Sequence, residues 1–368
     1  MNRNQQALGA IRGGRQREPL TDTQLLLTIT ICIFVGMYVL AISVWGGGFS
    51  KPQQLFDMLN NNAYLIIISC GLTIVMVAGG IDISVGGVTA LVVMSCVVHL
   101  DGQGGSVGSS ILLALGIGLG FGLVQGYLVS YLSIQPFIVT LAGMFFARGM
   151  TTIVSAEPRT VKNIAFLALK DGRIEIPWLG YTAKNGALIP GRIEIGVIIA
   201  LVLVVVVFIL LRWTKLGRNL YAIGGNSQSA LMLGINVKFT RLCSYIICGL
   251  LAGIGGFIFL THTAAGNATN AAGAEMNAIA SSIIGGTLLT GGVGNVIGTL
   301  FGTLILATIK SIVQASGLRD PWWQSITTGA MLCLFILLQS IVLSYRSKGS
   351  FKKSDARNAS GDNAKQAE

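Results

Sequence analysis

The chain has 368 residues, of which 52% are hydrophobic and only 11% are charged. A soluble domain carries about 25% charged residues, whereas these apolar residues gather into runs of roughly 20, the length that crosses a bilayer core as a helix, so composition excludes a water-soluble domain. The net charge of +11 does not indicate nucleic-acid binding, because the basic residues flank the apolar runs instead of gathering on one folded face.

The first 23 residues are predicted to form a basic cytoplasmic tail of disorder-like composition. The run that follows is too long for the core of a cleavable signal peptide, so we expect it to be retained as a span. The pattern predicts a transmembrane region over residues 24–343 and a polar tail over 344–368. Its ten predicted spans are 24–45, 59–79, 83–100, 109–131, 134–154, 193–212, 241–261, 277–291, 295–316 and 322–343.

Orientation follows from the basic residues, which gather in both tails and in the 213–240 loop. This pattern predicts that all three segments are cytoplasmic. The number of spans must then be even, with an odd number before an external loop at 155–192, and five spans on each side satisfy both conditions. The external loop nevertheless holds six basic residues, namely Arg159, Lys162, Lys170, Arg173, Lys184 and Arg192.

The two five-span halves, 24–154 and 193–343, must run in opposite directions, because five is odd. Inverted repeats often build a transport path at their interface. A short match supports such a repeat, since Ser84–Val88 in the first half resembles Gly292–Val296 in the second. The predicted fold class is therefore an all-α membrane protein with about ten transmembrane helices in two inverted five-helix halves.

A glycine-rich motif, Gly-Gly-Ile-Asp-Ile-Ser-Val-Gly, occupies residues 79–86. Two full spans of about 20 residues leave almost no room for a turn here, so the turn is either very tight or partly sunk in the membrane. Buried non-helical backbone must be satisfied by protein or by a water-filled path. Asp82 either caps the next helix or contacts the substrate or a gate. The candidate path residues of this motif are Gly80, Asp82, Ser84 and Gly86.

A second glycine-rich break, at 285–294, occupies the corresponding place in the second half. Paired Gly-interrupted segments point to a midplane path in secondary transporters, and by analogy they predict one here. The candidates are Gly286, Gly291, Gly292 and Gly294. The alternative is that such glycines only allow close helix packing, as the 109–131 span illustrates with Gly116, Gly118, Gly120, Gly122 and Gly126.

The predicted cytoplasmic loop contains a short helix at 227–233, with Asn226 placed to cap its start and Gly234 to end it. The small side chains of Ser229 and Ala230 suit a docking surface for a soluble partner. On physical grounds an ordered connector is an equal alternative.

Two basic residues lie inside predicted spans, Arg148 and Lys310, and either reach the outer interface or face a path. Other chemistry is not indicated. The sequence contains no ATP-binding Walker loop, nucleophile elbow or zinc-binding H-E-x-x-H, and its six cysteines form no C-x-x-C pair. We therefore expect no catalytic residues, no metal and no cofactor.

At these motifs the sequence resembles the permeases of bacterial ribose-type sugar ABC importers, from about residue 24 to 343. The 79–86 motif resembles the family hallmark, with Ile83 where leucine is usual. Residues 217–237 resemble the cytoplasmic coupling segment, with Gln228-Ser229-Ala230 in place of a Glu-Ala-Ala stretch. Residues 275–286 resemble a third block, with Asn277 where aspartate is usual.

The resemblance implies a multi-pass permease in the bacterial inner membrane that imports a monosaccharide and is not itself an enzyme. It implies cytoplasmic ABC ATPase subunits, an extracytoplasmic sugar-binding protein, and a second permease subunit, either identical or a paralogue. The 285–302 run followed by Trp322-Trp323 most resembles galactofuranose-importer permeases. The rival interpretation is a secondary transporter driven by an ion gradient. The implied coupling residues are Gly217, Arg218, Gly224, Gly225, Asn226, Ser229, Ala230 and Gly234.

Overall fold

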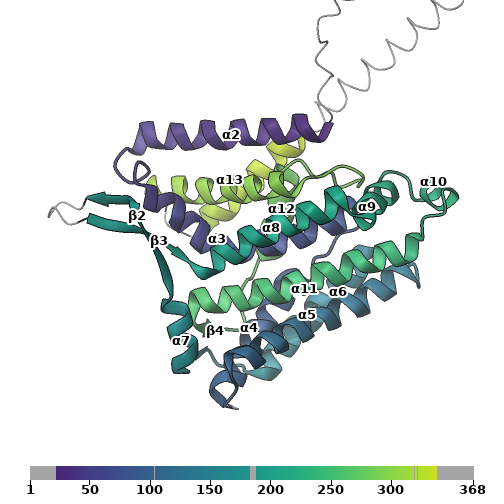
Figure 1. Ribbon diagram of the computed structural model, residues 1–368, viewed down its shortest axis with the longest axis horizontal. Helices are drawn as coiled ribbons and strands as arrows, with labels where there is room; N and C mark the ends of the chain where they lie inside the picture. Colours follow the sequence, from purple (N-terminus) through teal and green to yellow (C-terminus); the bar gives the residue numbers. More distant parts are fainter. Residues whose placement is uncertain (1–21, 103, 183–187, 319, 321, 338–368) are drawn as a thin grey trace, which may run out of the picture.

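The computed structural model describes residues 22–102, 104–182, 188–318, 320 and 322–337. Figure 1 shows long helices lying side by side in one bundle. Those of the first half are α2 (Asp22–Trp45), α3 (Pro52–Val77), α4 (Val85–Gly102), α5 (Val107–Ser130) and α6 (Pro136–Val154). Those of the second half are α8 (Ile195–Trp213), α9 (Lys215–Gly225), α10 (Ser227–Met232), α11 (Val237–Thr263), α12 (Ala274–Ile284) and α13 (Val296–Ala315).

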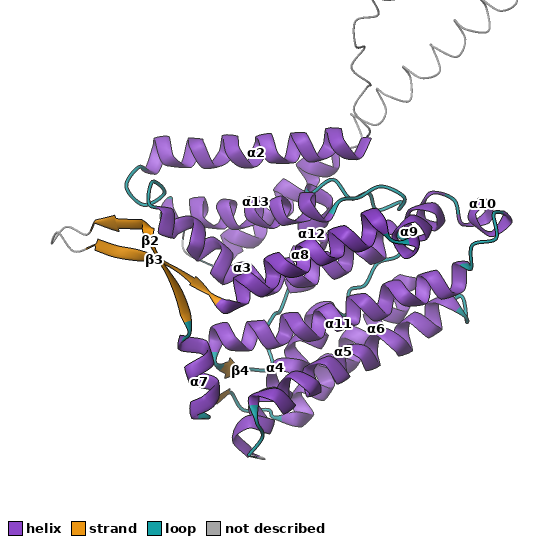
Figure 2. Cartoon of the chain, in the orientation of Figure 1, coloured by secondary structure: helices purple, strands orange, loops and turns teal. Residues whose placement is uncertain are grey.

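Between the halves lie β1 (Arg159–Thr160), α7 (Ile164–Asp171), β2 (Arg173–Thr182) and β3 (Leu188–Glu194). Strands β2 and β3 pair as an antiparallel hairpin. Strand β1 pairs antiparallel with β4 (Ala265–Gly266), which follows α11. Figure 2 shows the hairpin and α7 at one end of the bundle and α10 at the opposite end. The predicted external loop and the predicted coupling loop therefore occupy opposite ends, as the proposed topology requires.

An all-α membrane architecture is confirmed, since eight helices are long and apolar enough to cross a bilayer. The ten-span arrangement in inverted halves is not confirmed. The predicted span at 277–291 is wrong as a crossing, because α12 has only 11 residues and a helix of that length reaches about half of the ~30 Å core. Of the predicted span at 322–343, the structure describes an apolar helix, Trp322–Leu337, and the rest lies outside the described residues.

Several predicted features lie outside the described residues altogether: most of the 1–23 tail, the whole of the 344–368 tail, and Lys184 in the external loop. The described part of the external loop does carry its predicted basic residues. Arg159, Lys162, Arg173 and Arg192 are exposed at the hairpin end.

The centre of the bundle is α3. In its most apolar stretch 78% of the residues are buried, against 17% in α2, so α2 lies at the edge with its apolar side chains turned toward lipid. Helix α11 packs against both α3 and α5. The glycines of α5 divide between two faces: Gly118, Gly122 and Gly126 pack closely on α11, whereas Gly116 and Gly120 face open space. The predicted packing face is therefore right for three of the five glycines.

Candidate functional site

The first break in the helices spans residues 78–84, between α3 and α4. Gly79 adopts a left-handed backbone with φ +79°, a conformation that glycine reaches without steric cost. The amide of Gly80 donates to the Val75 carbonyl at 2.9 Å. The carbonyl of Ile81 accepts from the Tyr245 hydroxyl of α11 at 3.3 Å. The break is thus sunk within the protein and satisfied by it, as predicted for non-helical backbone at this depth.

Asp82 is buried, with 2% of its surface exposed. Its Oδ1 accepts from the Ser84 amide at 2.9 Å and from the Ser84 hydroxyl at 2.6 Å, immediately before α4 begins. The Ser84 hydroxyl also lies 3.1 Å from Gln125 Oε1 of α5. This geometry agrees with the capping interpretation of Asp82, because a short acidic side chain satisfies free amides at a helix start. Contact of Asp82 with substrate stays a separate prediction.

The second break, residues 285–295, joins α12 to α13. Gly291 and Gly292 both have positive φ, +88° and +74°. Within the break the Leu288 amide donates to the Val293 carbonyl at 3.0 Å. The Gly292 amide donates to the Val77 carbonyl at the end of α3, at 2.9 Å. A direct backbone hydrogen bond therefore joins the second break to the end of α3, one residue before the first break and more than 200 residues away in sequence.

A third segment meets the breaks at this point, the C-terminal end of α9. A Cβ on Gly224 would overlap the Val77 carbonyl and lie 2.5 Å from the Gly292 amide nitrogen. A Cβ on Gly291 would lie 2.8 Å from Gly79 Cα. We call the group Gly79, Gly224, Gly225, Gly291 and Gly292 the glycine junction. At Gly224, Gly291 and Gly292 the neighbouring backbones approach so closely that no side chain fits, which is the close approach that glycine permits, whereas a Cβ on Gly225 would meet nothing within 4 Å.

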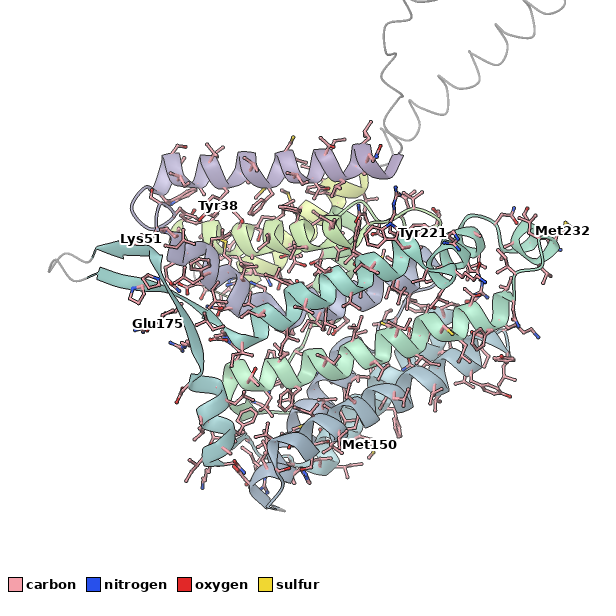
Figure 3. All side chains as sticks on the ribbon, viewed as in Figure 1. Tyr38, Lys51, Met150, Glu175, Tyr221 and Met232 are labelled. Atoms are coloured by element: carbon pink, nitrogen blue, oxygen red, sulfur yellow. The ribbon has the colours of Figure 1, made fainter. Side chains whose placement is uncertain are left out.

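One tyrosine side chain reinforces the glycine junction. The hydroxyl of Tyr221, on α9, donates to the Gly294 carbonyl in the second break at 2.8 Å. Figure 3 shows Tyr221 at the α9–α10 end of the bundle. Helix α9 is thus fastened to the second break by a side chain as well as by its glycines, so that a displacement of α9 acts directly on that break.

Helix α10 follows α9 and forms as the sequence predicts. Asn226 Oδ1 accepts from the Ser229 amide at 2.9 Å. The helix ends at Met232, and Gly234 follows with φ +79°. Both the capping residue and the terminating glycine are therefore confirmed.

The outward face of α10 differs from the prediction. Ala230 is buried against the chain itself, so its small side chain cannot seat α10 in a partner's groove. The polar residues Ser227, Gln228 and Ser229 are exposed, and so are three apolar residues that follow Ala230, namely Leu231, Met232 and Leu233, with 81% of Met232 accessible. Figure 3 shows Met232 at the far end of α10, away from the bundle. We call these three apolar residues the α10 tip. Exposed apolar side chains of this kind mark interaction sites.

The remaining predicted residues have other surroundings. A Cβ on Gly86 would overlap the Glu275 carboxylate, and one on Gly286 would lie 2.8 Å from Leu26 of α2. These two glycines therefore serve contacts away from the glycine junction. Gly217 abuts the end of α8, and the Arg218 guanidinium donates to the Trp213 carbonyl at 3.3 Å. Both residues shape the bend between α8 and α9.

Arg148 has a contact that the sequence did not reveal. Its guanidinium donates to the carbonyls of Asn270 at 2.6 Å and Ala271 at 3.0 Å, in the loop before α12. It also lies 4.0 Å from Glu275 Oε2, an oxygen with no hydrogen-bond partner among the described residues. Arg148 thus fastens α6 to the loop before α12 instead of reaching the outer interface. Lys310 lies in α13 and is half-buried.

The arrangement suits mechanical transmission better than chemistry. The two breaks and the amphipathic helix α9 contact one another through their backbones. Helix α10, which follows α9, carries the exposed apolar α10 tip. Within the described part of the chain, no three His, Cys, Asp or Glu side chains gather in a way that could hold a metal ion.

The chain matches the family described as the branched-chain amino acid transport system permease component over residues 54–336. It is 39% identical over 319 residues to the inner membrane ABC transporter permease protein YjfF of Escherichia coli K12, covering 85% of this chain and 91% of that protein.

Two relatives have names that specify a sugar. The fructose import permease protein FruG of Bifidobacterium longum is 32% identical over 328 residues, covering 88% of this chain and 93% of that protein. The ribose import permease protein RbsC of Escherichia coli K12 is 30% identical over 301 residues, covering 81% and 89% respectively. No solved structure matches the chain.

Proposed function

We propose a mechanism from one premise: this chain belongs to the permease-component family of bacterial ABC transporters and is the permease subunit of an importer for a monosaccharide. It is a multi-pass protein of the inner membrane. The ion-gradient-driven alternative has no support among its relatives.

We propose the partners of the chain from its membership of this permease family. Cytoplasmic ATPase subunits bind and hydrolyse ATP, because the chain contains no Walker loop of its own. An extracytoplasmic binding protein delivers the sugar, and a second permease subunit, identical or paralogous, completes the membrane domain. The family membership supports these assemblies, and the exposed α10 tip supplies a surface on which an ATPase subunit could dock.

The observation that carries the mechanism is the glycine junction. ATP-driven closure of the ATPase subunits displaces the α10 tip and, with it, α9. The displacement passes through Gly224 to the Val77–Gly292 hydrogen bond, where both breaks meet. The breaks then change the access of the membrane path from one side to the other. The candidates in the two breaks, including Asp82 and Ser84, line or support that path in this proposal, and the chain performs no covalent chemistry.

The choice of sugar stays a prediction. The relatives named above import fructose and ribose by their names, whereas the 285–302 run and Trp322-Trp323 favour galactofuranose. Competition of unlabelled ribose, fructose and galactofuranose against labelled galactofuranose uptake would rank the three sugars.

The transport class is tested in proteoliposomes that contain the permease, its ATPase subunits and the binding protein. We expect sugar uptake that needs ATP inside the liposomes and continues after ionophores have collapsed every ion gradient. Uptake that persists without ATP and stops with the ionophores would contradict the proposal.

Sidedness is tested with two positions of equal accessibility at opposite ends. Ile164 of α7 is 84% exposed and Met232 of α10 is 81% exposed. In a cysteine-free background, a membrane-impermeant thiol reagent added from outside should label Ile164→Cys and leave Met232→Cys unlabelled until the cells are opened. The opposite labelling pattern would reverse the proposed topology.

A further inference from the structure

A polar pocket lies under α10, where the end of α5 and the turn into α6 meet the start of α11. Its volume is about 490 Å³. The residues that matter to its chemistry are Ser130, Ser133, Asn236, Lys238 and Arg241. We call it the α10 pocket. None of these residues belongs to the glycine junction.

The charge of the α10 pocket is uniformly positive. Lys238 and Arg241 both line it. The two stretches of chain that form it contain no Asp or Glu, since none occurs between Asp101 and Glu157 or between Glu194 and Glu275. The ammonium of Lys238 lies 6.0 Å above the ring of Tyr131, which holds this side chain at the rim. The described wall of the pocket therefore attracts an anion and offers no internal carboxylate to neutralise it.

A buried hydroxyl in the wall of the pocket lacks a partner. Ser130 is 3% exposed, and its Oγ makes no hydrogen bond within the described structure. Buried polar groups are nearly always hydrogen-bonded, and an unpartnered one calls for an explanation. An acceptor bound in the pocket would satisfy this hydroxyl.

The start of α11 also favours the binding of an anion in the α10 pocket. This helix has 27 residues, and its capping residue Asn236, in the wall of the pocket, accepts from the Phe239 amide at 3.0 Å. The N-terminal end of a long helix carries partial positive charge and favours anions. The helix end, two cations and an unpartnered hydroxyl thus converge on one cavity.

We propose that the α10 pocket binds a phosphate group. A phosphate presents several acceptor oxygens, which suit a guanidinium, an ammonium and a hydroxyl together better than the two oxygens of a carboxylate. The position of the α10 pocket favours an anionic phospholipid as the source of this phosphate. The pocket opens at the ends of two spanning helices, beside the exposed side chains of Leu132 and Ile134, and basic pockets between such helices bind lipid headgroups. A soluble phosphate ester offers the same chemistry.

The pocket is connected to transport because Ser227 and Leu231 of α10 also line it. A bound phosphate would hold α10 against the ends of α5 and α11 and so set its position for the ATPase subunit. This consequence rests on the proposed coupling role, whereas phosphate binding itself does not.

The test uses the purified full-length chain and native mass spectrometry with phosphatidylglycerol or phosphatidylcholine. The variant Lys238→Gln/Arg241→Gln should weaken phosphatidylglycerol retention at least about tenfold, because each basic residue near the membrane surface contributes roughly 1 kcal/mol of attraction to an anionic lipid. The control Arg212→Gln/Lys215→Gln removes the same charge from exposed positions near the same end, outside the pocket, and should retain the lipid as the parent chain does.

A second arm adds inorganic phosphate to lipid-depleted protein. A rise in melting temperature that disappears in the pocket variant would identify a soluble phosphate as the ligand. Ser130→Ala should lose part of the binding in whichever arm is positive while leaving the melting temperature of the ligand-free protein unchanged. Equal behaviour of the pocket and control variants in both arms would overturn the proposal.

Discussion

The two breaks look alike in sequence, yet the protein holds them in different ways. Side chains secure the first, where Asp82 binds Ser84 and Tyr245 binds the Ile81 carbonyl. The second is held mainly by backbone hydrogen bonds, Leu288–Val293 and Gly292–Val77, to which the Tyr221 hydroxyl adds a bond to the Gly294 carbonyl. Five of the seven residues of the first break are buried, with Gly79 exposed, whereas five of the eleven residues of the second are buried, with Leu289 and Thr290 exposed.

The difference teaches that glycine-rich breaks at matching positions can have unequal mechanical roles. A buried segment held by several side chains is a fixed support, because moving it would leave polar groups unsatisfied. A partly exposed segment that leans on the backbones of α3 and α9 moves when α9 moves. We therefore assign the support to the first break and the moving element to the second.

Removing the side-chain anchor of the first break should have the largest effect on stability. Asp82→Ala leaves the buried Ser84 amide without its acceptor and the Ser84 hydroxyl with Gln125 Oε1 alone, at a cost of about 1–3 kcal/mol. We expect a lower melting temperature in detergent and little transport. Asp82→Asn keeps an acceptor oxygen and should be nearly as stable as the parent. A stable Asp82→Asn protein that carries no sugar would show that the charge of Asp82 acts in the path, and the comparison between a support and a moving element would fail.

Crowding the second break should have a smaller effect on stability and a clear effect on transport. Gly291→Ala places a side chain at φ +88°, which costs about 1–2 kcal/mol, and presses it against Gly79. The matched control is Gly273→Ala, where φ is +77° but a Cβ meets nothing within 4 Å. Both variants carry the backbone strain, so only Gly291→Ala should lose sugar uptake in proteoliposomes. Equal loss in both would assign the effect to strain alone.

Loosening the link between α9 and the second break should be milder. Tyr221→Phe removes the hydroxyl that donates to the Gly294 carbonyl, worth about 1 kcal/mol. We expect sugar-stimulated ATP hydrolysis to continue while less sugar enters per ATP. The control is Tyr127→Phe, on an exposed face of α5, which should leave the ratio of sugar to ATP unchanged. An unchanged ratio in Tyr221→Phe would remove this side chain from the transmission route.

Altering the α10 tip should change the stability of the chain least. Met232→Ser replaces a side chain that is exposed, so the change in free energy of unfolding should stay within about 0.5 kcal/mol. Co-purification with the ATPase subunit should nevertheless fall, whereas Met276→Ser, exposed on α12, should leave it intact. Full retention of the ATPase by a Leu231→Ser/Met232→Ser protein would place the docking surface elsewhere.

The sequence predicts those features that depend on local pattern. Run length locates the long helices, and Asn226 with Gly234 locates α10, because caps and terminating glycines act within a few residues. Crowding of two spans into 59–100 predicts that the turn around Asp82 is either very tight or partly sunk in the membrane, and the structure buries Asp82 within the protein.

The local sequence pattern does not predict other features of the structure. The apolar run 277–291 continues past the end of α12, so its hydropathy hides the turn after Ile284. The sequence pattern predicts a loop over 213–240, where the structure has α9; the Thr214 cap and the spacing of Leu220 and Ile223 are the signals that indicate this helix. The inward direction of Ala230 needs the fold itself.

The glycine junction escapes for a different reason. Its contacts join backbones that are far apart in sequence. Glycines have no side chains, so no side-chain pattern predicts which segments they contact. The glycines can be found in the sequence, but which of them meet cannot.

The most direct test of the account compares two neighbouring glycines of α9. A Cβ on Gly224 would strike the Val77 carbonyl and the Gly292 amide, whereas a Cβ on Gly225 would meet nothing within 4 Å. The measurement is ATP-driven sugar uptake by the assembled transporter carrying Gly224→Ala or Gly225→Ala, with ATPase retention as a check on assembly. Forcing the junction apart should cost at least the ~1.4 kcal/mol that corresponds to a tenfold change, so Gly224→Ala should lose about tenfold or more of its uptake while Gly225→Ala stays near the parent level. Equal uptake by the two variants would contradict transmission through the glycine junction.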